Sequence, residues 1–294
     1  AVILDELAMS QDDPQDVCYE EFLNQLYGYS PLGRPVGGTA STVAATPLEA
    51  VKSHHQRWYQ PQHLVVAAAG DISHDYLAEL IMTAAAKNGW ELDSVKDSEI
   101  PSCPAPLPAV RADKQLNKKV EQAQIIIGTR SLPANSPQRD TLSLLLTILS
   151  GGMSARLFQE IREKRGLAYS TYAFDSSYTD SGAFGLYAGC APKNLQKVTD
   201  LLHRELEKLA ESGVEERELK EALVLLSGGV LLWIDDNRAR MSRLGLAEVT
   251  GVRLRTIDQM KAALRRVTVA DICSLAAQFL DAPQVKVTVS PTVS

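Results

Sequence analysis

Cysteine is scarce in this 294-residue sequence, and the few copies form no pattern. The four residues, Cys18, Cys103, Cys190 and Cys273, lie far apart and show no paired spacing. Scattered cysteines favour reduced thiols, most of them buried as small apolar side chains, over a disulfide framework. This usage predicts a protein of a reducing compartment rather than a secreted disulfide scaffold.

Long apolar runs and clusters of one charge sign are also missing. The longest apolar run, residues 142–149, contains Ser143 and Thr147 and falls short of the ~18 residues that a membrane span needs. The formal net charge is −6, and the sequence has no stripe of lysine and arginine. Both features argue against nucleic acid or an anionic membrane as the main partner. No signal-peptide pattern opens the chain. We therefore expect a cytoplasmic protein that binds neither a membrane nor nucleic acid.

Length and composition predict a globular protein of two domains. The chain is longer than one hydrophobic core usually supports, and 45% of its residues are hydrophobic against 22% charged. Serial prolines precede a polar, basic stretch without periodicity, which is typical of a linker. We place the first domain at 1–100, the linker at 101–118 and the second domain at 119–294.

The first hundred residues predict helices around one buried strand. Residues 1–27 form a helical pattern that Pro14 should kink or break. The sequence 46–49, Thr-Pro-Leu-Glu, has the pattern of a capping box and predicts a helix to about Tyr59. The continuously apolar run 63–71 is typical of a strand buried on both faces, and a helix should follow at 75–88.

The later residues predict a sheet packed with helices. Capping patterns at Thr256 and Thr268 mark two helix starts, and Gly228-Gly229 predicts a bend in a long helical region at 215–249. The other expected elements are a strand at 120–130, a helix to residue 149, a hairpin of 169–178 with 182–190, an amphipathic helix at 195–209 and a strand at 284–290. This order predicts the α+β class with a mixed, largely antiparallel sheet.

Residues 150–170, Ser-Gly-Gly-Met-Ser-Ala-Arg-Leu-Phe-Gln-Glu-Ile-Arg-Glu-Lys-Arg-Gly-Leu-Ala-Tyr-Ser, are the most informative stretch. Gly151-Gly152 leads into a helix that carries Arg162, and Gly166 ends that helix shortly before Tyr169 begins a strand. This stretch resembles the substrate-holding half of the pitrilysin-like zinc peptidases (inverzincins, M16). The resemblance implies half-shell domains, and it implies that Arg162 and Tyr169 bind the peptide substrate across a cavity from a zinc ion.

Segments near the start carry the same resemblance in the family's order. Residues 2–7, Val-Ile-Leu-Asp-Glu-Leu, resemble the helix with the distal metal-binding glutamate, and segments 31–39, 59–63 and 65–71 resemble later parts of the first domain. The resemblance implies that Glu6 is a zinc ligand. For Gly151 and Gly152 two interpretations stay open, a mobile substrate-binding loop at the cavity mouth or a plain helix cap and turn.

The family's His-x-x-Glu-His motif is absent from the sequence. Adjacent His54 and His55 point about 100° apart on a helix and cannot chelate one metal together, and His63, His74 and His203 stand alone. A catalytic zinc needs three protein ligands and a carboxylate base. We therefore expect an incomplete zinc site and no catalytic residue in this chain, with the base on a segment outside it.

Two functions from different classes follow. The first is part of a zinc metalloendopeptidase that hydrolyses peptides or small unfolded proteins in a closed chamber, with the missing part of the first domain or a homologous subunit as partner. The alternative is a non-catalytic structural or partner subunit of the core-protein type. The presence of Glu6, Arg162 and Tyr169 together argues against this alternative, because a scaffold has no need for all three. A generic α+β binding module, which predicts no zinc chemistry in the intact protein, has little support.

Overall fold

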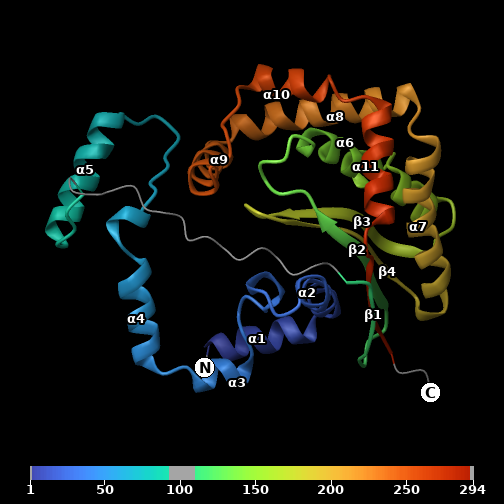
Figure 1. Ribbon diagram of the computed structural model, residues 1–294, viewed down its shortest axis with the longest axis horizontal. Coiled ribbons are helices and arrows are strands. Elements are labelled where there is room, and N and C mark those ends of the chain that lie inside the picture. Colours follow the sequence, from blue (N-terminus) through green and yellow to red (C-terminus); the bar gives the residue numbers. More distant parts are fainter. Residues whose placement is uncertain (1, 93–109, 292–294) are drawn as a thin grey trace. The chain divides into compact units, whose positions relative to one another are not determined.

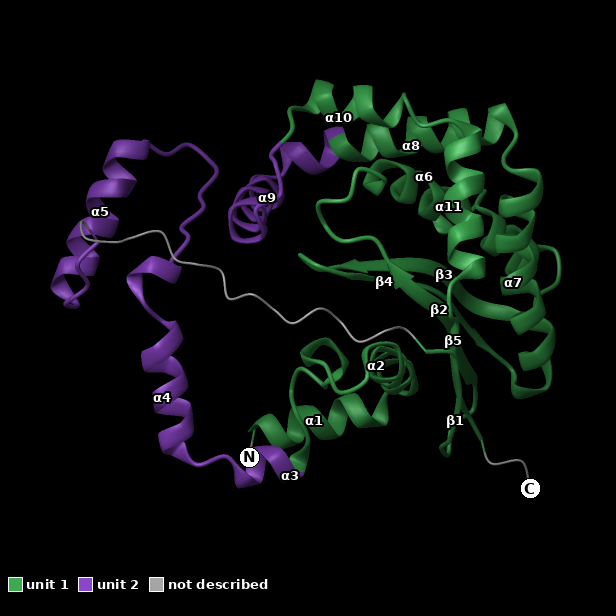
Figure 2. Ribbon diagram, in the orientation of Figure 1, with its two compact units in different colours: residues 1–40, 105–230, 255–294 green, residues 41–104, 231–254 purple. Residues whose placement is uncertain are grey.

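A five-stranded sheet organises the larger of two units in the computed structural model, which describes residues 2–92 and 110–291 (Figures 1 and 2). Unit 1 comprises Ala1–Ala40, Ala105–Val230 and Arg255–Ser294, and unit 2 comprises Ser41–Pro104 and Leu231–Leu254. Residues 2–40 thus fold with the sheet of the later residues. The domain bounds expected from the sequence stay a prediction.

The sheet has the strand order β1-β5-β2-β4-β3. The β1 and β5 strands pair in parallel, and every other neighbouring pair is antiparallel. The strands span β1 Ala112–Asn117, β2 Ala123–Ser131, β3 Ala168–Ser177, β4 Gly182–Cys190 and β5 Val285–Ser290. Together with the helices, this mixed sheet confirms the expected α+β class.

Strands β2, β4 and β5 are buried on both faces, and the period of two along them divides their side chains between two cores. In β2, Ile125 and Ile127 join the larger core, whereas Ile126 points to the other face. In β4, Phe184 and Leu186 likewise alternate with Ala183 and Tyr187. The near-continuous apolar sequence of these strands therefore reflects helices on both sides.

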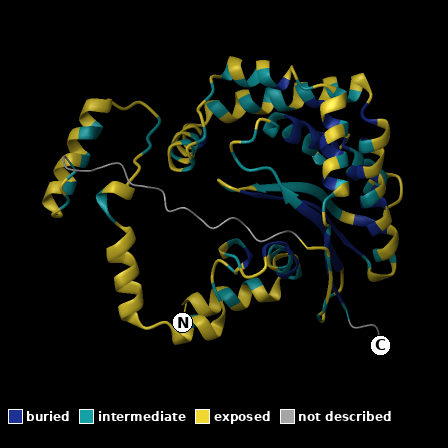
Figure 3. Ribbon diagram, in the orientation of Figure 1, coloured by how far each residue is buried: buried dark blue, intermediate teal, exposed yellow. Residues whose placement is uncertain are grey.

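The larger core lies between the sheet and helices of the second half of the chain. Its side chains come from helices α6 Arg139–Ser150, α7 Leu195–Ser212, α8 Glu216–Asp235, α10 Ile257–Leu264 and α11 Val269–Asp281. In α7 the residues Val198, Leu202 and Leu209 are fully buried, as the amphipathic pattern predicts. Figure 3 shows the buried residues mainly in the sheet and on α6 and α7, whereas α8 and α10 are mostly intermediate or exposed.

The opposite face is covered by α2 Pro14–Tyr27, which follows α1 Val2–Asp12 (Figure 1). Phe22, Leu26 and Cys18 of α2 pack on Val287 and other sheet residues. The predicted break at Pro14 is confirmed. Asp13 caps the second helix by accepting hydrogen bonds from the amides of Gln15 and Asp16.

Unit 2 is helical and much more exposed (Figure 3). Its helices are α4 Leu48–Trp58, α5 His74–Lys87 and α9 Asn237–Thr250, and α3 Ala40–Ala45 stands at its start. The predicted buried strand at 63–71 is wrong. Leu64, Val65 and Val66 are extended but 46%, 40% and 50% exposed, and no described strand pairs with them. Residues 64–70 instead line a groove with α5 and α9.

Residues 101–109 of the expected linker lie outside the described residues, and residues 112–117 form β1. Two other local expectations are corrected by the fold. Thr46 caps no helix, because its hydroxyl donates to the carbonyl of Thr42 in α3. The long helical region breaks at Asp236, whose side chain caps α9, and α8 continues through Gly228-Gly229.

Single-turn helices fill three connections, η1 Pro31–Gly33, η2 Pro61–His63 and η4 Pro192–Asn194. Each has proline in its first turn, where a missing amide hydrogen costs nothing. Within residues 2–92 and 110–291, no helix has the length and apolarity that crossing a membrane requires.

Candidate functional site

The structure brings Arg162 and Tyr169 together. The guanidinium carbon of Arg162 lies 4.9 Å from the ring centroid of Tyr169 and 4.9 Å from that of Phe158. This geometry is a double cation–π contact, in which the ring faces attract the delocalised charge. Tyr169 is 76% exposed and Arg162 is half-buried. The two side chains therefore form one exposed pair, which we call the Arg162–Tyr169 pair.

The polar atoms of this pair have no internal partner among the described residues. No carboxylate pairs with Arg162, and no hydrogen bond involves its guanidinium or the Tyr169 hydroxyl there. Two rings thus hold the guanidinium in place while its N–H donors stay available. An arginine fixed by stacking rather than by an ion pair is suited to bind the acceptors of a ligand.

Arg162 lies on a π-helix, η3 Phe158–Glu163. The amide of Lys164 donates to the carbonyl of Gln159, five residues earlier, at 2.9 Å. Leu157 and Ile161 are fully buried on the core side, so Phe158 and Arg162 face away from the larger core. Such single-turn π segments occur frequently at functional sites.

Tyr169 owes its position to a second irregularity. Gly166 has a φ of +57°, and its amide donates to the carbonyl of Arg162, which ends the helix. At the start of β3 the register with β4 shifts, because Ala168 lies opposite Cys190 and Ser170 opposite Gly189. Tyr169 is the extra residue of this bulge. A bulge re-aims a side chain, and here it leaves Tyr169 exposed beside Arg162.

Gly151 and Gly152 are exposed at the end of α6. The amide of Gly151 caps the helix by donating to the carbonyl of Thr147 at 2.7 Å, and a Cβ at this position would approach that carbonyl oxygen to 2.6 Å. Gly152 has a φ of +152°, which also favours glycine. The cap and turn are therefore present. A role of Gly151 and Gly152 in substrate binding stays a prediction.

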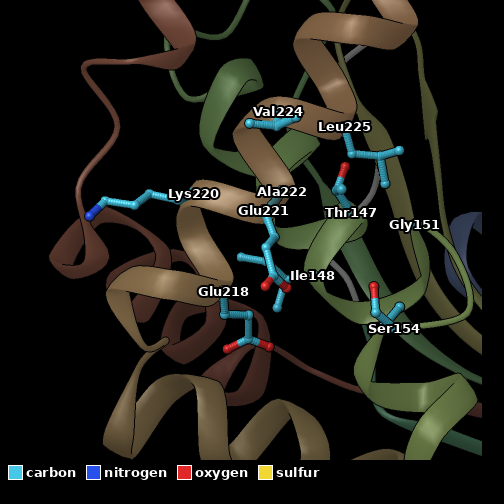
Figure 4. Close-up of a pocket in the computed structure, with 11 residues that line it drawn as sticks. Thr147, Ile148, Gly151, Ser154, Glu218, Lys220, Glu221, Ala222, Val224 and Leu225 are labelled. Carbon is cyan, nitrogen blue, oxygen red and sulfur yellow. The ribbon is translucent and has the colours of Figure 1, made fainter.

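A cavity of about 490 Å³ lies beside Gly151, between α6 and α8 (Figure 4). Its walls carry Thr147 and Ile148 from α6, Ser154 from the following turn, and Glu218, Glu221, Val224 and Leu225 from α8. Arg162 and Tyr169 do not line it. No sequence pattern predicts this cavity, because it depends on the packing of two helices that are far apart in the chain.

The described residues do not form a zinc site. Glu6 is an exposed residue of α1, and nowhere in 2–92 or 110–291 do three histidine, cysteine, aspartate or glutamate side chains gather with metal-binding geometry. His55 stacks on Tyr59, and His54 and His63 lie against Trp58. A single exposed carboxylate does not fit a catalytic zinc ion, which takes three protein ligands. The assignment of Glu6 as a ligand stays a prediction.

The fold and the 150–170 stretch define the class of protein. The model of the family described as "Peptidase M16 inactive domain" matches residues 47–226, more than half of the chain. The chain belongs to the M16 peptidase family, as its resemblance to the pitrilysin-like peptidases predicted.

Its relatives include several bacterial proteins named uncharacterized zinc proteases. The chain is 38% identical over 281 residues to one from Streptomyces coelicolor, and the match covers 95% of this chain and 61% of that protein. A relative from Mycobacterium leprae is 37% identical, with 95% and 62% covered. The chain thus spans about three-fifths of the length of these two relatives.

Solved structures share the fold at low sequence identity. The "peptidase M16 inactive domain from Pseudomonas fluorescens" matches with a TM-score of 0.83 at 19% identity, covering 99% of this chain and 69% of that one. A chain of "Complex III2 from Candida albicans" also reaches 0.83, at 17% identity, with 98% and 70% covered. These matches support the half-shell architecture alone.

Proposed function

We propose that this chain is the substrate-holding part of an M16 zinc metalloendopeptidase. The observation that carries the proposal is the Arg162–Tyr169 pair, whose donors are held in place without internal partners. A guanidinium offers a fork of N–H donors to peptide carbonyl oxygens, and a tyrosine hydroxyl can add one more. The substrate would be an extended peptide or a small unfolded protein, because its backbone carbonyls must be free to accept these bonds.

Peptide hydrolysis is proposed for the complete protein. Zinc would supply the hydrolytic chemistry when bound, and its histidine ligands and the catalytic base would come from outside this chain. Glu6 is the one residue here that we propose as a ligand. No hydrolytic step is assigned to the described residues, since they form no metal site. The same proposal includes a closed chamber and a cytoplasmic location. It also includes a partner, which is either the missing part of the first domain or a homologous subunit.

Peptide binding tests the role of the Arg162–Tyr169 pair. Fluorescence anisotropy with labelled, unstructured peptides should show R162A binding about tenfold more weakly than the wild type, a loss of about 1.4 kcal/mol. Y169F should show a smaller loss, because it keeps the stacked ring and removes only the hydroxyl. R165A is the matched control, since Arg165 lies on the same segment but pairs with Glu160. Equal affinity of R162A and wild type would contradict the proposal.

A non-catalytic subunit is the second candidate. The absence of the His-x-x-Glu-His motif from this sequence favours it. Arg162 and Tyr169 argue against it, because a scaffold gains nothing from exposed donors that have no hydrogen-bond partner among the described residues. Zinc analysis of the full-length gene product separates the two, since a stoichiometric zinc ion supports the peptidase and its absence supports the subunit.

A further inference from the structure

Arg156 makes a set of directional contacts just ahead of the π-helix. Its Nε and Nη2 atoms each donate to the Glu218 carboxylate at 2.7 Å, and Nη2 also donates to the carbonyl of Gly213 at 3.0 Å. Only 17% of the Arg156 side chain is exposed. Burial alone would lower the pKa of Arg156, but the hydrogen bonds and charge of Glu218 outweigh it and leave that pKa raised. The bidentate pair ties the start of the helix to α8.

The other hydrogen bonds at the start of this helix are local: the amide of Ala155 donates to the carbonyl of Gly152, and the side-chain amide of Gln159 donates to the carbonyl of Met153. Gly152 precedes the helix in an exposed turn where nothing lies within 4 Å of a Cβ position. Leu157 and Ile161 set which side of the helix faces the core, but apolar contacts are not directional and do not fix the exact rotation about the helix axis. Tyr169 lies on β3, a different element, so its contact with Arg162 depends on how the helix is turned.

We propose that Arg156 is a positioning residue for the Arg162–Tyr169 pair. Its bidentate bond to Glu218 fixes the rotation of the segment 156–163 and so keeps the Arg162 guanidinium over the Tyr169 ring. A buried Arg–carboxylate pair has a planar, two-bond geometry that a lysine cannot reproduce. The position of Arg162 over Tyr169 can be measured without a ligand, whereas the effect of Arg156 on peptide binding rests on the proposed function.

Fluorine NMR of protein labelled with 3-fluorotyrosine tests the geometry directly. The sequence has nine tyrosines, and Y169F assigns the resonance of Tyr169. R162A defines the position of that resonance without the cation. In E218Q and in R156K, the Tyr169 resonance should move toward its R162A position while the resonances of the other tyrosines stay in place.

D140N is the matched control variant. Asp140 also accepts a bidentate, partly buried pair of bonds, from Arg255 at 2.7 and 2.9 Å, at the other end of α6. It should leave the Tyr169 resonance unchanged. An unmoved resonance in both E218Q and R156K, with R162A shifted, overturns the proposal. Global unfolding of both variants, seen as collapse of all tyrosine resonances, also overturns it, because the pair would then hold the whole fold.

Peptide affinity gives the second measurement. R156K should bind the labelled peptide about tenfold more weakly than D140N at equal folded fraction, since small misplacement of binding groups is costly. The two proposals can fail separately. If R162A binds peptide normally, the proposed function fails, whereas a shifted Tyr169 resonance in R156K still supports the positioning role.

Discussion

Glu160 accepts hydrogen bonds from two cations of its own segment, Lys164 and Arg165. These hydrogen bonds lower the pKa of Glu160 from its ordinary 4.5 to about 2, and the bond from Lys164 has the larger effect. Both cations lie just after the π-helix, so this small network closes the end of the segment that carries Arg162. It also occupies Arg165, whereas Arg162 on the π-helix has no carboxylate partner among the described residues.

The lowered pKa makes this contribution to stability dependent on pH. A depressed carboxyl pKa stabilises the folded state above the unfolded pKa and loses that effect as pH falls through the folded pKa. Urea unfolding should therefore show wild type more stable than E160Q by less than about 1 kcal/mol at pH 6, because both cations of the network are partly exposed to solvent. The difference should vanish between about pH 4.5 and 2. A constant difference across this range would contradict the prediction.

The sequence identified the two candidate site residues, Arg162 and Tyr169, through the family resemblance. Their contact with each other is seen only in the structure. The bulge at Tyr169 could not be foreseen, because it depends on pairing with Cys190 and Gly189, about twenty residues later. The stack of Phe158 under Arg162 had a weak signal, namely their spacing of four residues.

Helix boundaries were predictable where the capping side chains act locally. Thr256 and Thr268 both form the complete capping boxes that their sequences predict. Thr46 has a similar pattern but bonds back to the preceding helix, which the pattern alone does not reveal. The break in the long helical region falls at Asp236, whose side chain accepts a hydrogen bond from the amide of Arg238, whereas Gly228 and Gly229 are accommodated inside α8.

Glycine substitutions test the turn that joins the π-helix to β3. Gly166 has a φ of +57° with no atom within 4 Å of a Cβ position, so G166A should cost about 1 kcal/mol through backbone conformation alone. Gly228 is equally open but lies inside α8, and G228A should stabilise by up to about 1 kcal/mol. Urea midpoints measure both. A lower urea midpoint for G166A and a higher one for G228A confirm that the turn needs glycine at position 166. An unchanged midpoint for G166A would contradict this.

At the scale of the whole molecule, the packing of α2 on the sheet can be followed through the reactivity of buried cysteine thiols. Burial raises the pKa of Cys18 to about 12 and that of Cys190 to about 11. Both thiols should therefore resist alkylation in the native protein, with rates that rise only as denaturant unfolds it. Mass spectrometry of digested samples measures each cysteine. Half-buried Cys273 provides the internal comparison, and rapid native labelling of Cys18 would show that α2 leaves the sheet.

Zinc binding by the 294-residue chain is the second test at this scale. The described residues gather no set of three metal-binding side chains, so the chain should compete poorly with chelators and cleave no peptide. Its zinc affinity should equal that of E6Q, because one exposed carboxylate adds little. A single stoichiometric zinc ion that survives dialysis would contradict this expectation.

The parallel strand pair has a consequence for how the protein is made. β1 reaches the rest of the sheet only through β5, which lies between β1 and β2 although it is the last strand in the described residues. A nascent chain emerging from the ribosome can therefore assemble β2, β3 and β4 early, whereas β1 must wait without a partner until translation reaches residues 285–290. During that interval the edge of β2 is open, and chaperone binding to stalled ribosome complexes should concentrate there.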